Sequence, residues 1–152
     1  MLPDAIIIGV KKSGTCALGV LMSLHPHVLS VRKEAHFFDE IERYSLGLKE
    51  YIRMLPRRSW SGQLLIEKTP AYFFEPEVEK RIQAAMPDVK LLLVVREPVT
   101  RMISEYIHNR IWHLNHSMAA EPFEVEKTLY NNGCKIVRVY LFMSLCLNHK
   151  HQ

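Results

Sequence analysis

Short apolar runs alternate along the chain with stretches of helical spacing. Four runs have the length and the leucine or β-branched content of buried strands: residues 5–10, 28–31, 63–67 and 90–95. Four stretches have helical spacing, and each has a proline at or just beyond one end: residues 14–24, 46–55, 76–86 and 98–112. Strands that alternate with helices indicate a parallel sheet covered on both faces. The pattern predicts an α/β fold of three layers around a central parallel sheet.

Composition and charge narrow the class of protein. A chain of 152 residues with 48% hydrophobic and 24% charged residues can form a core of its own, which excludes a disordered protein. The formal net charge is +4, and the excess lies entirely beyond residue 126, where no acidic residue occurs: Lys127, Lys135, Arg138 and Lys150. Composition therefore gives no support to a general basic surface for nucleic acid.

The chain changes in character after residue 133. Residues 139–147 form an apolar run, and residues 148–152 are polar. We therefore expect one domain over residues 1–133 and a divergent tail over residues 134–152.

No apolar run reaches the ~20 residues that a membrane helix needs, and the first residues do not resemble a secretory signal. The three cysteines have no metal-ligand spacing, so we expect no metal site.

A glycine-containing loop follows the first predicted strand. It reads GVKKSGT over residues 9–15, directly before the first predicted helix. Such a loop presents backbone N–H groups to an anion, and Lys12 and Thr15 would add a charge and a hydroxyl. Thr15 stands where the nucleotide P-loop pattern has lysine, which argues against ordinary ATP with magnesium as the ligand. A purely structural strand-to-helix turn is the alternative for this loop.

A second candidate phosphate site follows the strand at residues 90–95. Arg96 comes at the strand end, and Ser104 lies about two turns into the next helix. Arginine offers a planar, forked contact to phosphate. No acidic residue takes the place of the magnesium-binding aspartate of nucleotide hydrolases there, which weakens a kinase or nucleotide hydrolase interpretation further. A surface ion pair between Arg96 and Glu97 is the alternative.

A third group of polar residues joins two other strand ends. Glu34, His36 and Asp39 lie within six residues, and Lys68 follows the strand at residues 63–67. A carboxylate that is oriented by such neighbours can remove a proton from a hydroxyl group. A solvated loop carboxylate is the alternative for Glu34 taken alone.

Taken together, these segments resemble a known family. The ordered motifs are AIIIGVKKSGT, LHPHV, EAHFFD, EKTPAYF and LLLVVREPVTRMISEY, spread between residue 4 and about residue 133. The chain resembles the sulfotransferases that use 3′-phosphoadenosine 5′-phosphosulfate (PAPS). It is most similar to the N-terminal half of the catalytic domain of the heparan sulfate glucosamine 3-O-sulfotransferases, whose fold is P-loop-like.

The resemblance implies roles for individual residues. The residues that would bind PAPS are Lys12, Ser13, Gly14, Thr15, Cys16, Arg96 and Ser104. Arg96 and Ser104 would hold its 3′-phosphate. Glu34 would be the catalytic base for the glucosamine 3-hydroxyl of heparan sulfate, with His36, Asp39 and Lys68 beside it. No metal is implied. Family members are Golgi enzymes with an N-terminal anchor, so the Golgi lumen is the expected location.

The chain departs from the family at two places. Ser13 and Cys16 stand where the family usually has glycine and arginine, and Cys16 removes a positive charge near the phosphates. After residue 133 the family continues with further helices and a basic loop over PAPS, which the tail does not resemble. We therefore expect either a PAPS-dependent sulfotransferase or a C-terminally truncated, catalytically inactive fragment or isoform that keeps part of the PAPS site.

Overall fold

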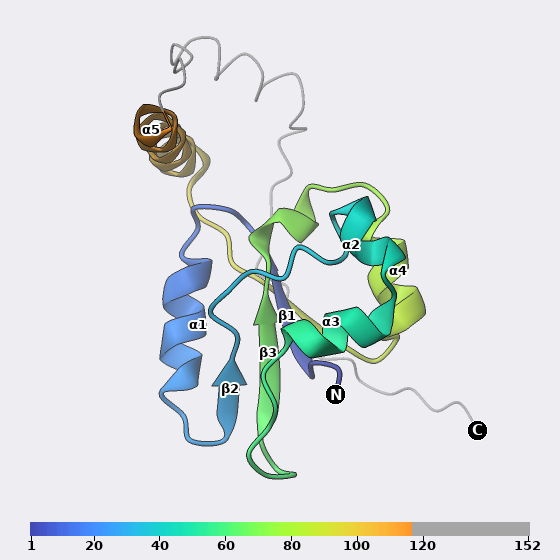
Figure 1. The fold of residues 1–152 in the computed structure, drawn as a ribbon. Coiled ribbons are helices and arrows are strands. Elements are labelled where there is room, and N and C mark those ends of the chain that lie inside the picture. Colours follow the sequence, from blue (N-terminus) through green and yellow to red (C-terminus); the bar gives the residue numbers. More distant parts are fainter. Residues whose placement is uncertain (117–152) are drawn as a thin grey trace, which may run out of the picture.

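Four parallel strands form the centre of the structure, a computed structural model that describes residues 1–116 (Figure 1). They are β1 (Ala5–Gly9), β2 (Val28–Ser30), β3 (Leu64–Lys68) and β4 (Lys90–Leu93). Their order across the sheet is β2-β3-β1-β4, so β3 lies between two strands that both precede it in the chain. The sequence predicts all four strands, and the α/β expectation is confirmed.

Helices cover both faces of the sheet (Figure 1). One face carries α1, and the opposite face carries α2, α3 and α4. The helices, with the short 3₁₀-helix η1, are α1 (Thr15–Ser23), α2 (Ile41–Ser45), α3 (Leu48–Met54), η1 (Pro70–Phe73), α4 (Val78–Ala85) and α5 (Pro98–Asn115). The sequence pattern misses α2 and η1, because elements of four or five residues are too short to show helical spacing.

The alternation of side chains along β1 explains the two layers. Ile6 packs into the larger core cluster, while Ala5 and Ile7 belong to a smaller cluster with residues of α1. Phe37 and Phe38, which precede α2, are fully buried in the larger cluster. Phe37 stacks on Tyr51 of α3 with the ring centroids 4.8 Å apart. This aromatic packing fixes the segment that directly follows Glu34 and His36.

The last described helix, α5, stands apart from the sheet (Figure 1). It begins at Pro98 as predicted and continues three residues beyond the predicted end, to Asn115. It leaves several apolar side chains exposed: Val99, Ile103, Ile107, Ile111 and Leu114. Within residues 1–116 no helix combines the length and hydropathy of a membrane span. The predicted boundary at residue 133 and the tail lie outside the described residues.

Candidate active site

The loop between β1 and α1 has the conformation that its glycines predict. A Cβ at Gly9 would lie 2.7 Å from Cβ of Phe73, so only glycine fits there. Gly14 precedes α1 with a φ of +98°, and Lys12 also has a positive φ, of +66°. The first turn of α1 holds no acidic residue, which leaves the positive end of the helix dipole unopposed by a carboxylate there. We call residues 9–15 the phosphate loop, after the phosphate binding that the sequence predicts for them.

One buried hydroxyl in the phosphate loop suits an external ligand. The side-chain oxygen of Ser13 is buried and has no hydrogen-bond partner among the described residues. Buried hydroxyls are normally paired, because an unpaired one loses its hydrogen bonds to water. Thr15 is also buried, at the start of α1. An anion that enters the loop would meet a hydroxyl, backbone N–H groups and the Lys12 ammonium.

Arg96 and Ser104 line a cleft beside the phosphate loop. The cleft has a volume of about 430 Å³ and is bounded by Lys12, by Arg96 and by one face of α5 that includes Ser104. We call it the α5 cleft. Arg96 Nη1 donates a long hydrogen bond of 3.4 Å to the Lys12 carbonyl oxygen. The volume lies in the range of small-molecule sites, and the lining combines the basic groups of Lys12 and Arg96 with isoleucine side chains of α5.

Glu97 caps α5 and does not form the surface ion pair with Arg96 that was the alternative. Its carboxylate caps α5 by accepting from the backbone N–H groups of Val99 (2.9 Å) and Thr100 (2.7 Å). These backbone hydrogen bonds lower the pKa of Glu97, and the nearby charge of Arg96 adds to the effect. Arg96 forms no ion pair within residues 1–116, so its guanidinium is available at the α5 cleft.

Arg101 of α5 forms an ion pair within its own helix that the sequence does not predict, and it also contacts the phosphate loop. Arg101 Nη1 lies 2.5 Å from Glu105 Oε2, and both side chains are largely buried. The same nitrogen lies 3.5 Å from the carbonyl oxygen of Lys11. The four-residue spacing on a helix was the available signal, but spacing alone does not distinguish a buried pair from a solvated one.

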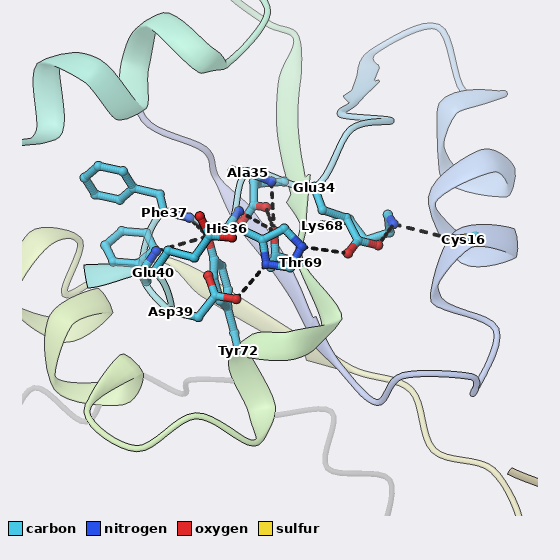
Figure 2. Close-up of polar contacts among 12 residues, drawn as sticks. Cys16, Glu34, Ala35, His36, Phe37, Asp39, Glu40, Lys68, Thr69 and Tyr72 are labelled. Carbon is cyan, nitrogen blue, oxygen red and sulfur yellow. Dashed lines mark hydrogen bonds and ion pairs between the residues drawn. The ribbon is translucent and has the colours of Figure 1, made fainter. Parts of the chain in front are cut away.

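The predicted catalytic residues come together in one cluster (Figure 2). Lys68 Nζ donates to Glu34 Oε1 at 2.6 Å, and His36 Nε2 lies 3.3 Å from Glu34 Oε2. The other ring nitrogen of His36 lies 2.6 Å from Asp39 Oδ2. We call these four residues the carboxylate cluster. Glu34 thus has one oxygen toward a lysine and one toward an imidazole, which fixes its orientation.

Lys68 also connects the carboxylate cluster to the phosphate side. Its Nζ lies 3.5 Å from Sγ of Cys16, in the first turn of α1 (Figure 2). Burial alone would lower the pKa of Lys68, but the hydrogen bond and charge of Glu34, together with Cys16, raise it on balance. Lys68 is therefore a protonated ammonium between the two predicted sites.

Three residues that the sequence analysis does not single out support the carboxylate cluster. Thr69 Oγ1 accepts from the backbone N–H of Ala35 at 3.0 Å, and Tyr72 Oη accepts from that of Phe37 at 3.1 Å. Glu67, the third, is fully buried and accepts from the Thr69 hydroxyl at 2.5 Å. An acidic residue at the end of an otherwise apolar strand was the available signal for Glu67.

Comparisons with known proteins agree with this arrangement. A family model described as "Sulfotransferase domain" matches residues 2–148. Heparan sulfate glucosamine 3-O-sulfotransferase 5 of Mus musculus is 40% identical over 149 residues, which are 93% of this chain and 42% of that protein. Heparan sulfate glucosamine 3-O-sulfotransferase 3B1 of Homo sapiens is 51% identical over 105 residues, which are 69% of this chain and 26% of that protein. The chain spans less than half the length of these curated relatives.

A solved structure shares the fold. The crystal structure of a sulfotransferase from Alicyclobacillus acidocaldarius matches with a TM-score of 0.67 and 26% sequence identity. The match covers 87% of this chain and 58% of that one.

Proposed function

The chain belongs to the sulfotransferase domain family, and on this premise we propose that it transfers the sulfuryl group of PAPS to the 3-hydroxyl of glucosamine in heparan sulfate. The proposed substrate class follows from the relatives, which are named as heparan sulfate glucosamine 3-O-sulfotransferases. The same similarity supports the Golgi lumen as the proposed location.

The contact of Glu34 with Lys68 and His36 carries the proposal. Glu34 keeps 30% of its side-chain surface exposed while both carboxylate oxygens are held by neighbours. In the proposed reaction Glu34 takes the proton of the glucosamine 3-hydroxyl, and the hydroxyl oxygen forms a bond to sulfur. The bond between sulfur and the bridging phosphate oxygen breaks, and 3′-phosphoadenosine 5′-phosphate leaves. Asp39 orients His36, and His36 orients Glu34.

The position of Lys68 suits charge stabilisation during this transfer. Its ammonium lies between Glu34 and the first turn of α1, where the proposed phosphosulfate would meet the acceptor. Negative charge builds up on the oxygens around sulfur as the bonds exchange, and a fixed cation stabilises it. Lys12, Ser13, Gly14, Thr15 and Cys16 would surround the phosphosulfate end. Arg96 and Ser104 would hold the 3′-phosphate in the α5 cleft.

A transfer assay tests the proposal. The chain is incubated with PAPS carrying a labelled sulfate and with heparan sulfate, beside the variants Glu34→Gln and Glu42→Gln. The Glu42 side chain is exposed on α2 and serves as the matched control. We expect label in the polysaccharide with the parent and with Glu42→Gln, and none with Glu34→Gln. Calorimetry should show that Glu34→Gln still binds 3′-phosphoadenosine 5′-phosphate.

A chimera extends the test beyond this chain. Residues 1–116 are joined to the C-terminal part of one of the longer relatives, and the same two variants are made. Transfer by the chimera and not by the parent would mean that the chain alone is an inactive form. Transfer by the Glu34→Gln chimera would refute the role of the base.

A further inference from the structure

We propose that Glu67 and Thr69 are positioning residues of the acceptor site, which hold the backbone that carries Glu34 and His36 without touching either substrate. The inference rests on the sulfotransfer reaction proposed above. It concerns two side chains with 0% exposure that lie under the carboxylate cluster, at the end of β3.

The hydroxyl of Thr69 takes part in three hydrogen bonds that connect Glu67 to the loop before α2. It donates to Glu67 Oε1 at 2.5 Å and accepts from the N–H groups of Ala35 at 3.0 Å and His36 at 3.4 Å. A hydroxyl has one proton and two lone pairs. Because ionised Glu67 can only accept, it draws the proton of Thr69 toward itself and leaves both lone pairs for the two loop amides.

These amides belong to a backbone conformation that needs support. His36 has a φ of +49°, in the left-handed region that residues other than glycine seldom occupy. Such a residue persists when its surroundings fix it. Thr69 bonds the N–H of His36 itself and that of the preceding residue, so it acts at the strained position (Figure 2).

The same element holds the partner of the proposed base. Glu67, Lys68 and Thr69 are consecutive, so one strand end fixes both the Lys68 ammonium and the loop amides. Lys68 Nζ is 2.6 Å from Glu34 Oε1, a contact that a small shift of the loop would break. Displacements of about 1 Å at a reacting group can cost about 100-fold in rate. Thr69 and Glu67 therefore control where Glu34 meets the acceptor hydroxyl.

The charge of Glu67 can change near neutral pH. The pKa of Glu67 is raised to about 7, chiefly by burial and in small part by the charge of Asp39. The hydrogen bonds with Thr69 and with the Ala35 backbone, and the charge of Lys68, act in the opposite direction. The groups that face Glu67 are Asp39, Lys68 and the buried hydroxyls of Tyr51 and Tyr72. Its other oxygen, Oε2, has no hydrogen-bond partner within the described residues. Proton uptake by Glu67 would weaken its hold on the Thr69 hydroxyl.

A matched pair of substitutions at Thr69 tests the positioning role. Thr69→Val keeps the shape and removes the hydroxyl, while Thr69→Ser keeps the hydroxyl. The measurements are kcat for sulfate transfer, the Kd of 3′-phosphoadenosine 5′-phosphate, and the NMR signals of the Ala35 amide and the His36 ring. We expect Thr69→Val to lower kcat about 100-fold, to change the Kd less than about twofold, and to move both NMR signals. Thr69→Ser should restore kcat and both signals.

Glu67→Gln tests the pH dependence with a side chain of the same shape. In the parent, the Ala35 amide signal should shift with an inflection near the Glu67 pKa of about 7. The variant should lack that inflection and should also lack the corresponding limb of the kcat profile.

Each outcome decides the proposal. A folded Thr69→Val with parental kcat and unmoved Ala35 and His36 signals would overturn it. If Thr69→Val does not fold, the Ala35 inflection decides: its loss in Glu67→Gln supports the role, and its persistence refutes it. If the parent transfers no sulfate, the proposed function of the chain fails, and the NMR signals alone still decide whether Glu67 and Thr69 hold the loop.

Discussion

The charged side chains of the carboxylate cluster are paired with one another, whereas Arg96 in the α5 cleft has no charged partner within residues 1–116. In the carboxylate cluster, Lys68, Glu34, His36 and Asp39 are linked in a continuous chain of contacts between 2.6 and 3.3 Å. In the α5 cleft, Arg96 makes one long hydrogen bond to a carbonyl and no ion pair within residues 1–116. The first region is organised before any ligand arrives, whereas the second offers charge to a ligand.

This difference suggests that the carboxylate cluster sets the orientation of reacting groups and that the α5 cleft sets the affinity for a nucleotide. The proposed base, Glu34, must be oriented before the reaction, and its contacts with Lys68 and His36 orient it. A binding site for a phosphate gains from basic groups that no internal carboxylate neutralises. We therefore expect changes at the carboxylate cluster to alter stability and turnover, and changes at the α5 cleft to alter nucleotide affinity. Four substitutions test this division.

The largest effect is expected from breaking the ion pair of the carboxylate cluster. Lys68→Met keeps the apolar stem of the side chain and leaves Glu34 without its cation. Lys68 is 6% and Glu34 30% exposed, so the pair is mostly enclosed. Loss of one partner of an enclosed pair should lower the free energy of unfolding by about 3–4 kcal/mol, measured by urea titration. Lys80→Met, on the exposed face of α4, is the control, and equal effects of the two would contradict the prediction.

The next effect concerns Glu67 and the pH dependence of stability. Its pKa is about 7 in the folded chain against 4.5 for the free side chain. Between these values the folded state holds a proton that the unfolded state has lost, so stability falls as the pH rises through this range. The contribution amounts to about 3 kcal/mol between pH 4 and 8.

Glu67→Gln removes this contribution. The difference in unfolding free energy between the variant and the parent should therefore change with pH between 4 and 8 in favour of the variant. Urea titrations at four pH values measure it. A constant difference would show that Glu67 does not titrate in this range.

A smaller effect is expected at the α5 cleft. Arg96→Ala should weaken binding of 3′-phosphoadenosine 5′-phosphate by about 1.5–3 kcal/mol, the usual value of a charge-assisted contact. Binding of adenosine 5′-phosphosulfate, which lacks the 3′-phosphate, should change little. Calorimetry with both nucleotides measures the preference, and Arg53→Ala, exposed on α3, is the control. A variant that still prefers the 3′-phosphate as strongly as the parent would remove Arg96 from this role.

The smallest effect is expected at Cys16, which lies directly after the phosphate loop and contacts Lys68 of the carboxylate cluster. Cys16→Arg adds a positive charge in the first turn of α1 and should tighten nucleotide binding by about 0.5 kcal/mol, as expected of an exposed charge. High salt should abolish the gain, because salt screens exposed charges. Cys16→Ser, which is small and neutral, should bind like the parent. Weaker binding by Cys16→Arg would indicate that repulsion from Lys68 dominates.

The sequence predicts the fold and the grouping of the carboxylate cluster for the same physical reason. Apolar runs identify the four strands, and parallel strands bring their carboxyl ends to one edge. Glu34 and Lys68 each follow a predicted strand, so their contact could be expected. The exposure of Arg96 could not be decided from the sequence, because Glu97 can either pair with it or cap α5.

The supporting residues could not be predicted because their role depends on three-dimensional packing. An acidic residue at the end of an apolar strand marks Glu67, but the residue types of EKTP do not tell whether its side chain is buried or solvated. The sequence also gives no sign of the positive φ of His36, because the usual sign is a glycine at the position itself and a histidine stands there. These features depend on hydrogen bonds between Thr69 and the backbone of Ala35 and His36, which lie 34 and 33 residues earlier in the chain.

The strand order also determines when the site can be completed during synthesis. β3 enters between β1 and β2 although it leaves the ribosome after both. A nascent chain that has emerged only to the end of β2 lacks β3, the strand that pairs with both β1 and β2. Glu34 emerges without its ammonium partner and without the hydroxyl that holds its loop. The segment that carries Glu34 and His36 therefore reaches its final form only after residue 69 emerges, as a consequence of translation order.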